Sequence, residues 1–247
     1  MADSIELRTI SEADIPDCAR IAGLAFENDR HTQLKARSPT DPYNHEEGMR
    51  GGLRYWLGKP AGEHLTTLAT DESTGETVGW VVWGLKGLDK PATKSGETTT
   101  ESTSEAAETA TAIASEANND NHKTARQKLE AYTSADMQTW MARLMPPGTR
   151  CMYICSIAVH PAWQHKGVGS ALLKPGLARA DEEGVFCWVH SSAAGADTFA
   201  KHGFVEVGKL DLDLDEWNLE RVDPPEGEGE KWGLYTFKYM KREADGV

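Results

Sequence analysis

The spacing of apolar residues predicts strands and helices in alternation along the first third of the chain. A short strand is expected over residues 5–10. Ser11 and Asp14 then form a helix start signal, because an acidic residue three positions after a serine can complete a capping box. Apolar residues recur at helical spacing over residues 15–26. Two apolar runs within residues 64–85 flank a polar turn and predict an antiparallel hairpin.

Helical spacing returns after residue 122. Residues 123–145 suit one or two amphipathic helices, closed by a Pro-Pro-Gly sequence. The apolar runs 151–159 and 185–191 predict buried strands, with a helix over residues 169–183 between them. A right-handed crossover through that helix would make the two strands parallel. A short helix that ends at Gly203 follows.

Two further strands, over residues 204–214 and 232–240, complete a single domain that spans 1–247. The fold class is α/β, with a mixed sheet and helices on both faces. The low-complexity residues 89–122 hold a single large aliphatic side chain and cannot bury enough apolar surface to offset the entropy of ordering. We therefore expect a flexible insertion there, followed by a helical insertion at 123–145.

The net charge of −13 is concentrated in two segments. Residues 93–122 carry six acidic side chains and one lysine, and residues 206–230 carry ten acidic and two basic side chains, so the rest of the chain is neutral by count. Contacts to a phosphate backbone need clustered lysine and arginine. We therefore expect no nucleic-acid partner.

The sequence shows no signal for membrane insertion, secretion or paired cysteines, and this predicts the cellular location. No apolar run approaches the roughly 20 residues that span a membrane, and the first residues have no apolar secretory core. None of the four cysteines forms a CxxC pair, so buried reduced thiols are favoured. A zinc site at Cys151, Cys155 and Cys187 is the less favoured alternative. These features predict a cytoplasmic protein with no membrane contact and no bound metal.

The most informative segment is VHPAWQHKGVGSALL, residues 159–173, where a strand turns directly into a helix. Gly167 and Gly169 would let a ligand approach the backbone without a Cβ in the way. Bare amides and the positive end of the helix dipole suit an anion, and two adjacent phosphates would engage several amides at once. The spacing fits neither a P-loop nor the dinucleotide-binding fingerprint.

This segment resembles the signature of the GNAT superfamily of acetyl-CoA-dependent N-acetyltransferases. In that signature a strand, the pattern V-x-P-x-x-[QR]-x-x-G-x-[GA] and a helix follow one another. A second strand and a short helix before Gly203 extend the likeness over residues 150–208. The resemblance implies a GNAT-like, strongly twisted sheet whose parallel central strands splay apart. It also implies acetyl-CoA as cosubstrate.

By this resemblance, the strand before the turn would offer backbone groups to the pantetheine arm, and the turn would hold the pyrophosphate. Val159 would also supply the amide that stabilises the thioester oxygen during attack. Lys166 either adds charge to the turn or is a solvated neighbour of the phosphates. The expected cofactor-binding residues are Ile157, Ala158, Val159, Gln164, His165, Lys166, Gly167, Val168, Gly169, Ser170 and Phe199.

The expected reaction needs an amine that has lost its proton and a thiolate that can leave. His190 is the preferred general base, because an imidazole is largely neutral at pH 7. A histidine that only caps a strand end is the open alternative, and Ser156 and Cys155 are alternative catalytic residues on the neighbouring strand. Family members often carry a proton-donating tyrosine at the position of Phe199, so Tyr153 or water would have to replace it here.

The acceptor side carries weaker signals. Trp83 and Trp140 would line an aromatic pocket or else belong to the core, and Glu27 and Asp29 would reach the same cleft from the first helix. The acidic stretch at 211–216 would attract a cationic amine or else form a solvated strand face.

Three functions follow from these observations. The first is acetyl transfer from acetyl-CoA to a small-molecule amine, such as a xenobiotic or a secondary metabolite. The second is a peptide or protein N-acetyltransferase, and the third is an acyl-CoA-binding regulator without turnover, which only Phe199 supports. The sequence leaves the oligomeric state open.

Overall fold

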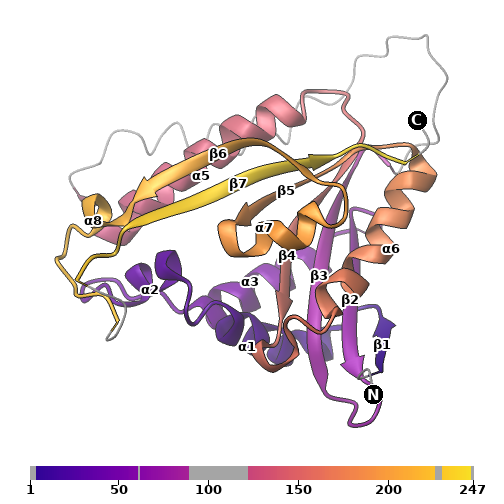
Figure 1. The fold of residues 1–247 in the computed structure, drawn as a ribbon, viewed down its shortest axis with the longest axis horizontal. Coiled ribbons are helices and arrows are strands. Elements are labelled where there is room, and N and C mark those ends of the chain that lie inside the picture. The colour runs from indigo at the N-terminus through magenta and orange to yellow at the C-terminus, as the bar shows by residue number, and fades with distance from the viewer. Residues whose placement is uncertain (1–3, 61, 89–121, 226–229, 246–247) are drawn as a thin grey trace.

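A seven-stranded sheet forms the centre of the computed structural model, which describes residues 4–60, 62–88, 122–225 and 230–245 (Figure 1). Its strand order is β1-β2-β3-β4-β5-β7-β6. β4 and β5 pair in parallel, and the other neighbouring strands pair antiparallel. The strands are β1 (Ile5–Arg8), β2 (His64–Asp71), β3 (Thr77–Lys86), β4 (Cys151–Val159), β5 (Cys187–Ser192), β6 (Val205–Asp213) and β7 (Leu234–Arg242).

The predicted mixed α/β sheet is thus confirmed, including the hairpin of β2 and β3 and the parallel pair of β4 and β5. The place of β7, between β5 and β6, was not predicted. The expected flexible insertion at 89–122 lies outside the described residues, apart from residue 122.

Helices cover both faces of the sheet. One face carries α6 (Val168–Glu183) and α7 (Ala193–Ala200), which pack into a large apolar cluster with Trp83 and Val189. The other face carries α1 (Ile15–Ala25) and α3 (His45–Leu57), whose cluster includes Trp80 and Val82. Burial of these apolar side chains supplies most of the driving force for the fold.

The first helix begins as expected, but two short helices after it were missed. The backbone amide of Ser11 donates to Asp14 at 2.8 Å before α1. α2 (Arg30–Ala36) is capped by Asp29, which accepts from the Thr32 amide at 2.8 Å. α3 is capped by Asn44 and buries only Leu53 among its residues. α2 buries a single large apolar side chain, Leu34, and therefore leaves no apolar period in the sequence. α3 does carry such a period, at Met49, Leu53, Trp56 and Leu57, and this signal was overlooked.

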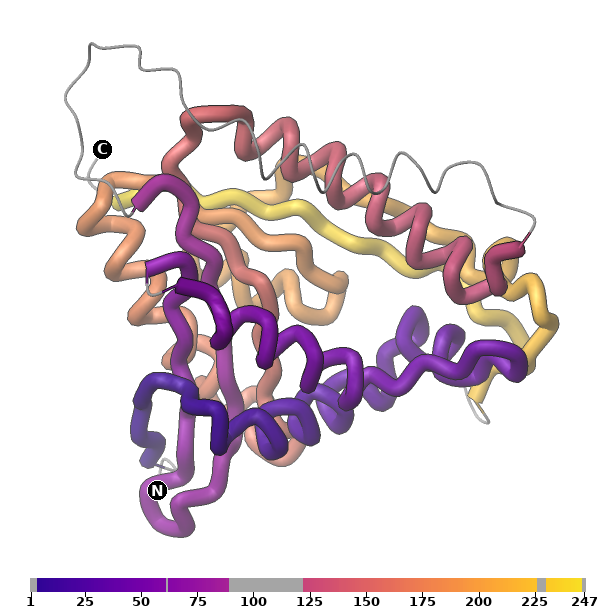
Figure 2. The backbone as a smooth tube through the Cα atoms, turned by 180° about the vertical axis from the view of Figure 1, so that it is seen from behind, coloured from indigo at the N-terminus to yellow at the C-terminus, as the bar shows by residue number. Residues whose placement is uncertain are grey.

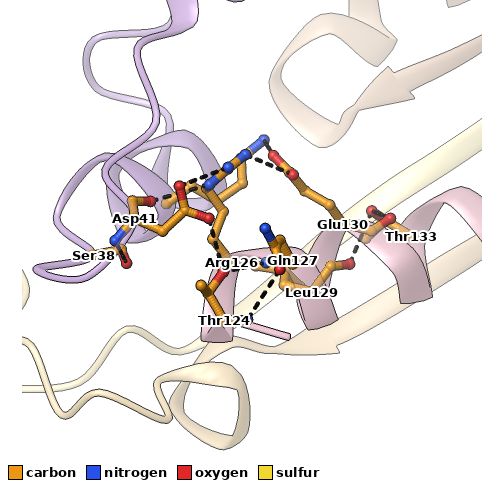
Figure 3. Close-up of polar contacts among 9 residues, drawn as sticks. Ser38, Asp41, Thr124, Arg126, Gln127, Leu129, Glu130 and Thr133 are labelled. Atoms are coloured by element: carbon orange, nitrogen blue, oxygen red, sulfur yellow. Dashed lines mark hydrogen bonds and ion pairs between the residues drawn. The ribbon is translucent and has the colours of Figure 1, made fainter. Parts of the chain in front are cut away.

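Residues 123–145 form essentially one helix, α5 (Ala125–Leu144), which runs beside β6 and β7 (Figure 2). Its first turn is joined to the loop after α2 by Arg126, which donates to Asp41 at 2.8 Å. The same guanidinium donates to Glu130 within α5, also at 2.8 Å (Figure 3). Towards its other end, Trp140 packs so closely on Gly208 of β6 that a Cβ there would lie 2.0 Å from the indole.

The parallel pairing of β4 and β5 ends early, and the two strands diverge beyond that point (Figure 1). The last pair is Ile154 with Val189. At the same place β4 holds one extra residue against β3, because Val82 faces Ser156 while Trp83 faces Ile154. Such a bulge bends the strand and increases its twist. The expected splay of the parallel strands is therefore present.

We expect replacement of Gly176 by alanine to destabilise the protein, because the new Cβ would lie 2.2 Å from the buried Trp83 ring. Overpacking of this kind lowers the free energy of unfolding by about 1–3 kcal/mol. The matched control is Gly51→Ala at an exposed position of α3, where a Cβ meets nothing within 4 Å and a gain of about 0.5–1 kcal/mol is expected. Urea unfolding of both variants measures the difference, and equal stabilities would contradict the packing.

Candidate functional site

A cavity of about 280 Å³ opens where β4 leaves β5. Its walls come from the end of α1 and the loop after it, from the end of β4, from the turn before α6, and from α7. Most of the lining is apolar, and Asp29 is its single carboxylate. The lining residues are Ala25, Phe26, Asp29, Ile157, Ala158, Val159, Gln164, His165, Gly169, Ser192, Ala194, Gly195, Thr198 and Phe199.

The end of β4 presents an open backbone edge to this cavity. Ile157 and Val159 pair with β3 on one side but have no pairing with β5 on the other. The amide of His160 donates to Val78 of β3 at 2.8 Å. Successive amides of an extended strand point to opposite edges, so the amides of Val159 and Ile157 point toward the open edge. An extended ligand can therefore pair with β4 in place of β5.

The turn before α6 leaves amides without side-chain caps. Gly167, the N-cap, adopts φ +88° and has no side chain to cap the amides that follow it. His165 also adopts a left-handed conformation, φ +61°. The first amides of a helix have no partner within the helix, and the helix dipole favours an anion there. Val168 is buried and anchors the turn, while the Lys166 ammonium lies 4.9 Å from the Trp163 ring.

Within the cavity lining, α7 contributes small and hydroxyl-bearing residues. Ser192 caps the helix by accepting from the Gly195 amide at 3.3 Å. Gly169 of α6 lies next to Thr198 of α7, since a Cβ at Gly169 would lie 3.6 Å from Thr198 Cγ2. Phe199 is buried at 4% exposure and packs edge-on against Phe204. The position at which family members often carry a tyrosine therefore bears a ring without a proton to donate.

Asp29 is held in place by two donors from different parts of the chain. The Thr32 amide donates to Oδ1 at 2.8 Å, and the Tyr235 hydroxyl donates to Oδ2 at 2.6 Å. Burial and the neighbouring Asp29 carboxylate raise the pKa of Tyr235 well above its usual range. Tyr235 was not among the predicted site residues. The only sequence signal for it is the alternation of aromatic residues along β7, at 235, 237 and 239.

His190 is the first residue of β5 beyond its last pair with β4, but it does not line the cavity. Its ring packs against Phe237 and Tyr239, at centroid distances of 4.4 and 4.7 Å. Its Nε2 is buried without a hydrogen-bond partner, and burial lowers the pKa of His190 to about 4. The imidazole is therefore neutral at pH 7, as expected for a base, but its affinity for a proton is low.

The other predicted residues on the acceptor side lie outside the lining. Trp83 is fully buried beneath α6 against Gly176, so of its two expected places it occupies the core and not a pocket. Trp140 stacks on Tyr239 at 4.7 Å, and Glu27 is exposed. None of these three side chains lines the cavity.

The alternative catalytic residues on β4 are also displaced from the cavity. Ser156 points toward Met49 of α3, with 3.8 Å between Oγ and Sδ. Burial raises the pKa of Cys155 to about 12 and raises that of Tyr153 above its usual range. A buried thiol of this kind is not a thiolate nucleophile at neutral pH.

Among the residues that the structure describes, no three His, Cys, Asp or Glu side chains gather where they could hold a metal ion. Nor does any helix in the described ranges have the length and apolar character needed to cross a membrane.

Comparison with known proteins identifies this architecture. Residues 28–204 match the model of the Acetyltransferase (GNAT) family. The chain belongs to this family of N-acetyltransferase enzymes, for which acetyl-CoA is the cosubstrate. The sequence matches no curated protein.

Solved structures share the fold at low sequence identity. Arylalkylamine N-acetyltransferase 2 from Aedes aegypti superposes with a TM-score of 0.59 at 10% identity, over 98% of this chain and 100% of that chain. The Drosophila melanogaster polyamine N-acetyltransferase that forms N-acetylagmatine gives a TM-score of 0.57 at 14% identity, over 97% and 100%.

One buried histidine, His31, and two half-buried ones, His45 and His190, should make the fold sensitive to acid. Burial lowers the pKa of His190 and of His45 to about 4, and that of His31 to about 3. Between pH 6.5 and 4 the unfolded chain therefore binds more protons at these histidines than the folded protein does. The free energy of unfolding is thus not reduced by them above pH 6.5, and it falls as the pH drops through this window.

For a single histidine, the loss between pH 7.5 and 5 amounts to about 2 kcal/mol. We expect the difference in free energy of unfolding between these two pH values to shrink by that amount in His190→Gln. Urea unfolding at both pH values measures it. Equal differences in the variant and the parent protein would show that His190 is not held neutral by the fold.

Proposed function

We propose that the protein transfers the acetyl group of acetyl-CoA to the amine of a small molecule by direct attack. The observation that carries this proposal is the meeting of three features in one cavity: the open edge of β4, the uncapped start of α6 and the single carboxylate of Asp29. The first two fit the two ends of an acyl-CoA, and the third fits an ammonium group.

The residues that would hold acetyl-CoA follow from this geometry. The turn from Gln164 to Ser170 would bind the pyrophosphate through its amides, as anions bind at helix N-termini. Ile157, Ala158 and Val159 would pair with the pantetheine arm along the open edge of β4. The Val159 amide would donate to the thioester oxygen as negative charge develops on it.

The chain's own groups limit how protons move in this reaction. The new C–N bond forms as the C–S bond breaks, the amine loses a proton, and the sulfur leaves as a thiolate. A thiolate with a pKa near 8.5 needs little help from an acid, which accounts for Phe199 at the usual tyrosine position. Asp29 would hold the incoming ammonium and orient its proton toward solvent or the carboxylate itself.

A small acceptor agrees with the size and lining of the cavity. Part of the roughly 280 Å³ must take the acetyl group and the end of the pantetheine arm, which leaves room for a compact amine. The two solved relatives of similar fold are named for arylalkylamine and polyamine acceptors, which are small amines as well.

Gly169 offers a direct test of cosubstrate binding. An alanine Cβ there would make ordinary contacts with Thr198 and Val159, at 3.6 and 3.9 Å, whereas leucine would fill the space where the α6 amides face the cavity. We expect Gly169→Leu to weaken acetyl-CoA binding at least tenfold, measured by isothermal titration. The control Gly169→Ala should stay within about threefold of the parent protein. Equal affinity in all three would place the CoA elsewhere.

The predicted role of His190 as base is tested by the pH profile. With its pKa near 4, His190 cannot itself produce an inflection of kcat/KM between pH 6 and 9. We therefore expect any inflection in this range to persist in His190→Gln, with kcat/KM reduced less than tenfold. Disappearance of the inflection, together with a loss of 100-fold or more, would instead identify His190 as the base.

A further inference from the structure

We propose that the acceptor is a monoamine with an aromatic body, bound through Asp29 and the aromatic side chains around it. This inference rests on the proposed function and names the substrate class of the same cavity. It is carried by the charge of the lining, by the rings beside Asp29, and by the hydrogen bond between Asp29 and Tyr235.

The charge of the lining fits one ammonium group and not two. Asp29 is the single carboxylate in the cavity and, within the described residues, forms no ion pair with a lysine or arginine. Lys35 interacts electrostatically with Asp29, but its ion pair is with Glu130, at 3.6 Å. A monocation can therefore neutralise Asp29 completely.

Three further carboxylates, from the loop after α2 and from α5, already accept hydrogen bonds from other side chains. Asp41 accepts from Arg126 at 2.8 Å (Figure 3), and Glu130 accepts from the same arginine at 2.8 Å. Asp136 accepts from the Tyr239 hydroxyl at 2.6 Å. Because no second carboxylate lines the cavity, a second ammonium or guanidinium group inside it would have no counter-charge, and an unpaired buried charge is costly.

Aromatic side chains share the cavity lining with Asp29 or contact its carboxylate. Phe26, three residues earlier, lines the cavity and packs against His45 at a centroid distance of 4.6 Å. Tyr235 contacts the Phe237 ring at 4.9 Å, edge to face. Phe26 is only half-buried, so part of its ring remains available within the cavity, whereas Tyr235 and Phe237 support Asp29 from outside the lining. A ligand ring gains stacking energy from such neighbours, and its ammonium gains from the ring faces.

Tyr235 is a positioning residue in this arrangement. Its hydroxyl and the Thr32 amide each occupy one oxygen of the Asp29 carboxylate, which fixes the orientation of the group. Each carboxylate oxygen can accept a second hydrogen bond. The remaining lone pairs can therefore receive an ammonium group at a fixed place beside the end of β4.

An amine panel tests the substrate class in the full-length protein. It comprises 2-phenylethylamine, hexylamine, agmatine and spermidine, with release of free thiol from acetyl-CoA as the readout. We expect kcat/KM for 2-phenylethylamine to exceed each of the other three at least tenfold. Equal or higher values for agmatine or spermidine would overturn the monoamine assignment, and an equal value for hexylamine would overturn the aromatic one.

Two variants test the residues. We expect Asp29→Asn to lower kcat/KM for 2-phenylethylamine at least 30-fold while acetyl-CoA affinity stays within threefold. Tyr235→Phe should raise KM three- to tenfold and change kcat less than twofold, a split that a loss of fold would not give. The control is Asp17→Asn, an exposed α1 carboxylate paired with Arg20, which should behave as the parent protein.

Different results would overturn the proposed function and the proposed substrate class. Absence of acetyl-CoA binding would overturn the proposed function itself. Normal acetyl-CoA binding without turnover of any amine in the panel, or an unchanged KM in Asp29→Asn, would overturn the substrate class alone.

Discussion

Two neighbouring parallel strands in this protein share only three residue pairs, and the site depends on where that pairing stops. β4 continues for five residues beyond Ile154, its last residue paired with β5, while the end of β5 keeps its pairing with β7 alone. An unpaired backbone edge inside a protein is costly unless a partner satisfies it. The extra residue that β4 carries against β3 at the same place adds twist. The divergence therefore creates a cavity and a backbone edge that suits an extended ligand.

The remaining elements surround this opening with complementary chemistry. α6 begins at Gly167 beside the end of β4, so its amides and dipole meet the cavity where phosphates would lie. α7 closes the other wall with small residues and Phe199. Asp29 brings one negative charge from the loop between α1 and α2. The uncapped start of α6 and the Asp29 carboxylate thus belong to different elements around one largely apolar lining.

The strand–turn–helix around Gly167 could be predicted because its signal is local. Strand spacing, two glycines and the helix period all lie within residues 151–183, and the structure follows them closely. The hairpin of β2 and β3 and the helix of residues 123–145 were predicted for the same reason. Short helices such as α2, with few buried positions, leave no comparable period.

The acceptor side could not be predicted because its contacts join distant parts of the chain. Asp29 and Tyr235 are 206 positions apart, and β7 reaches its place only by inserting between β5 and β6. In the sequence, Trp83 cannot be told from a tryptophan that lines a pocket. It is buried because its side of β3 faces α6. Tertiary packing, not residue type, therefore sets which aromatic side chains reach the site.

Amide hydrogen exchange with and without acetyl-CoA tests the central claim most directly. We expect saturating acetyl-CoA to slow exchange in two segments, residues 157–159 and 165–170, because these segments border the cavity at the open edge of β4 and the start of α6. Binding that slows exchange elsewhere and leaves both segments unchanged would contradict the account, since the divergence of β4 and β5 would then not be the cosubstrate site.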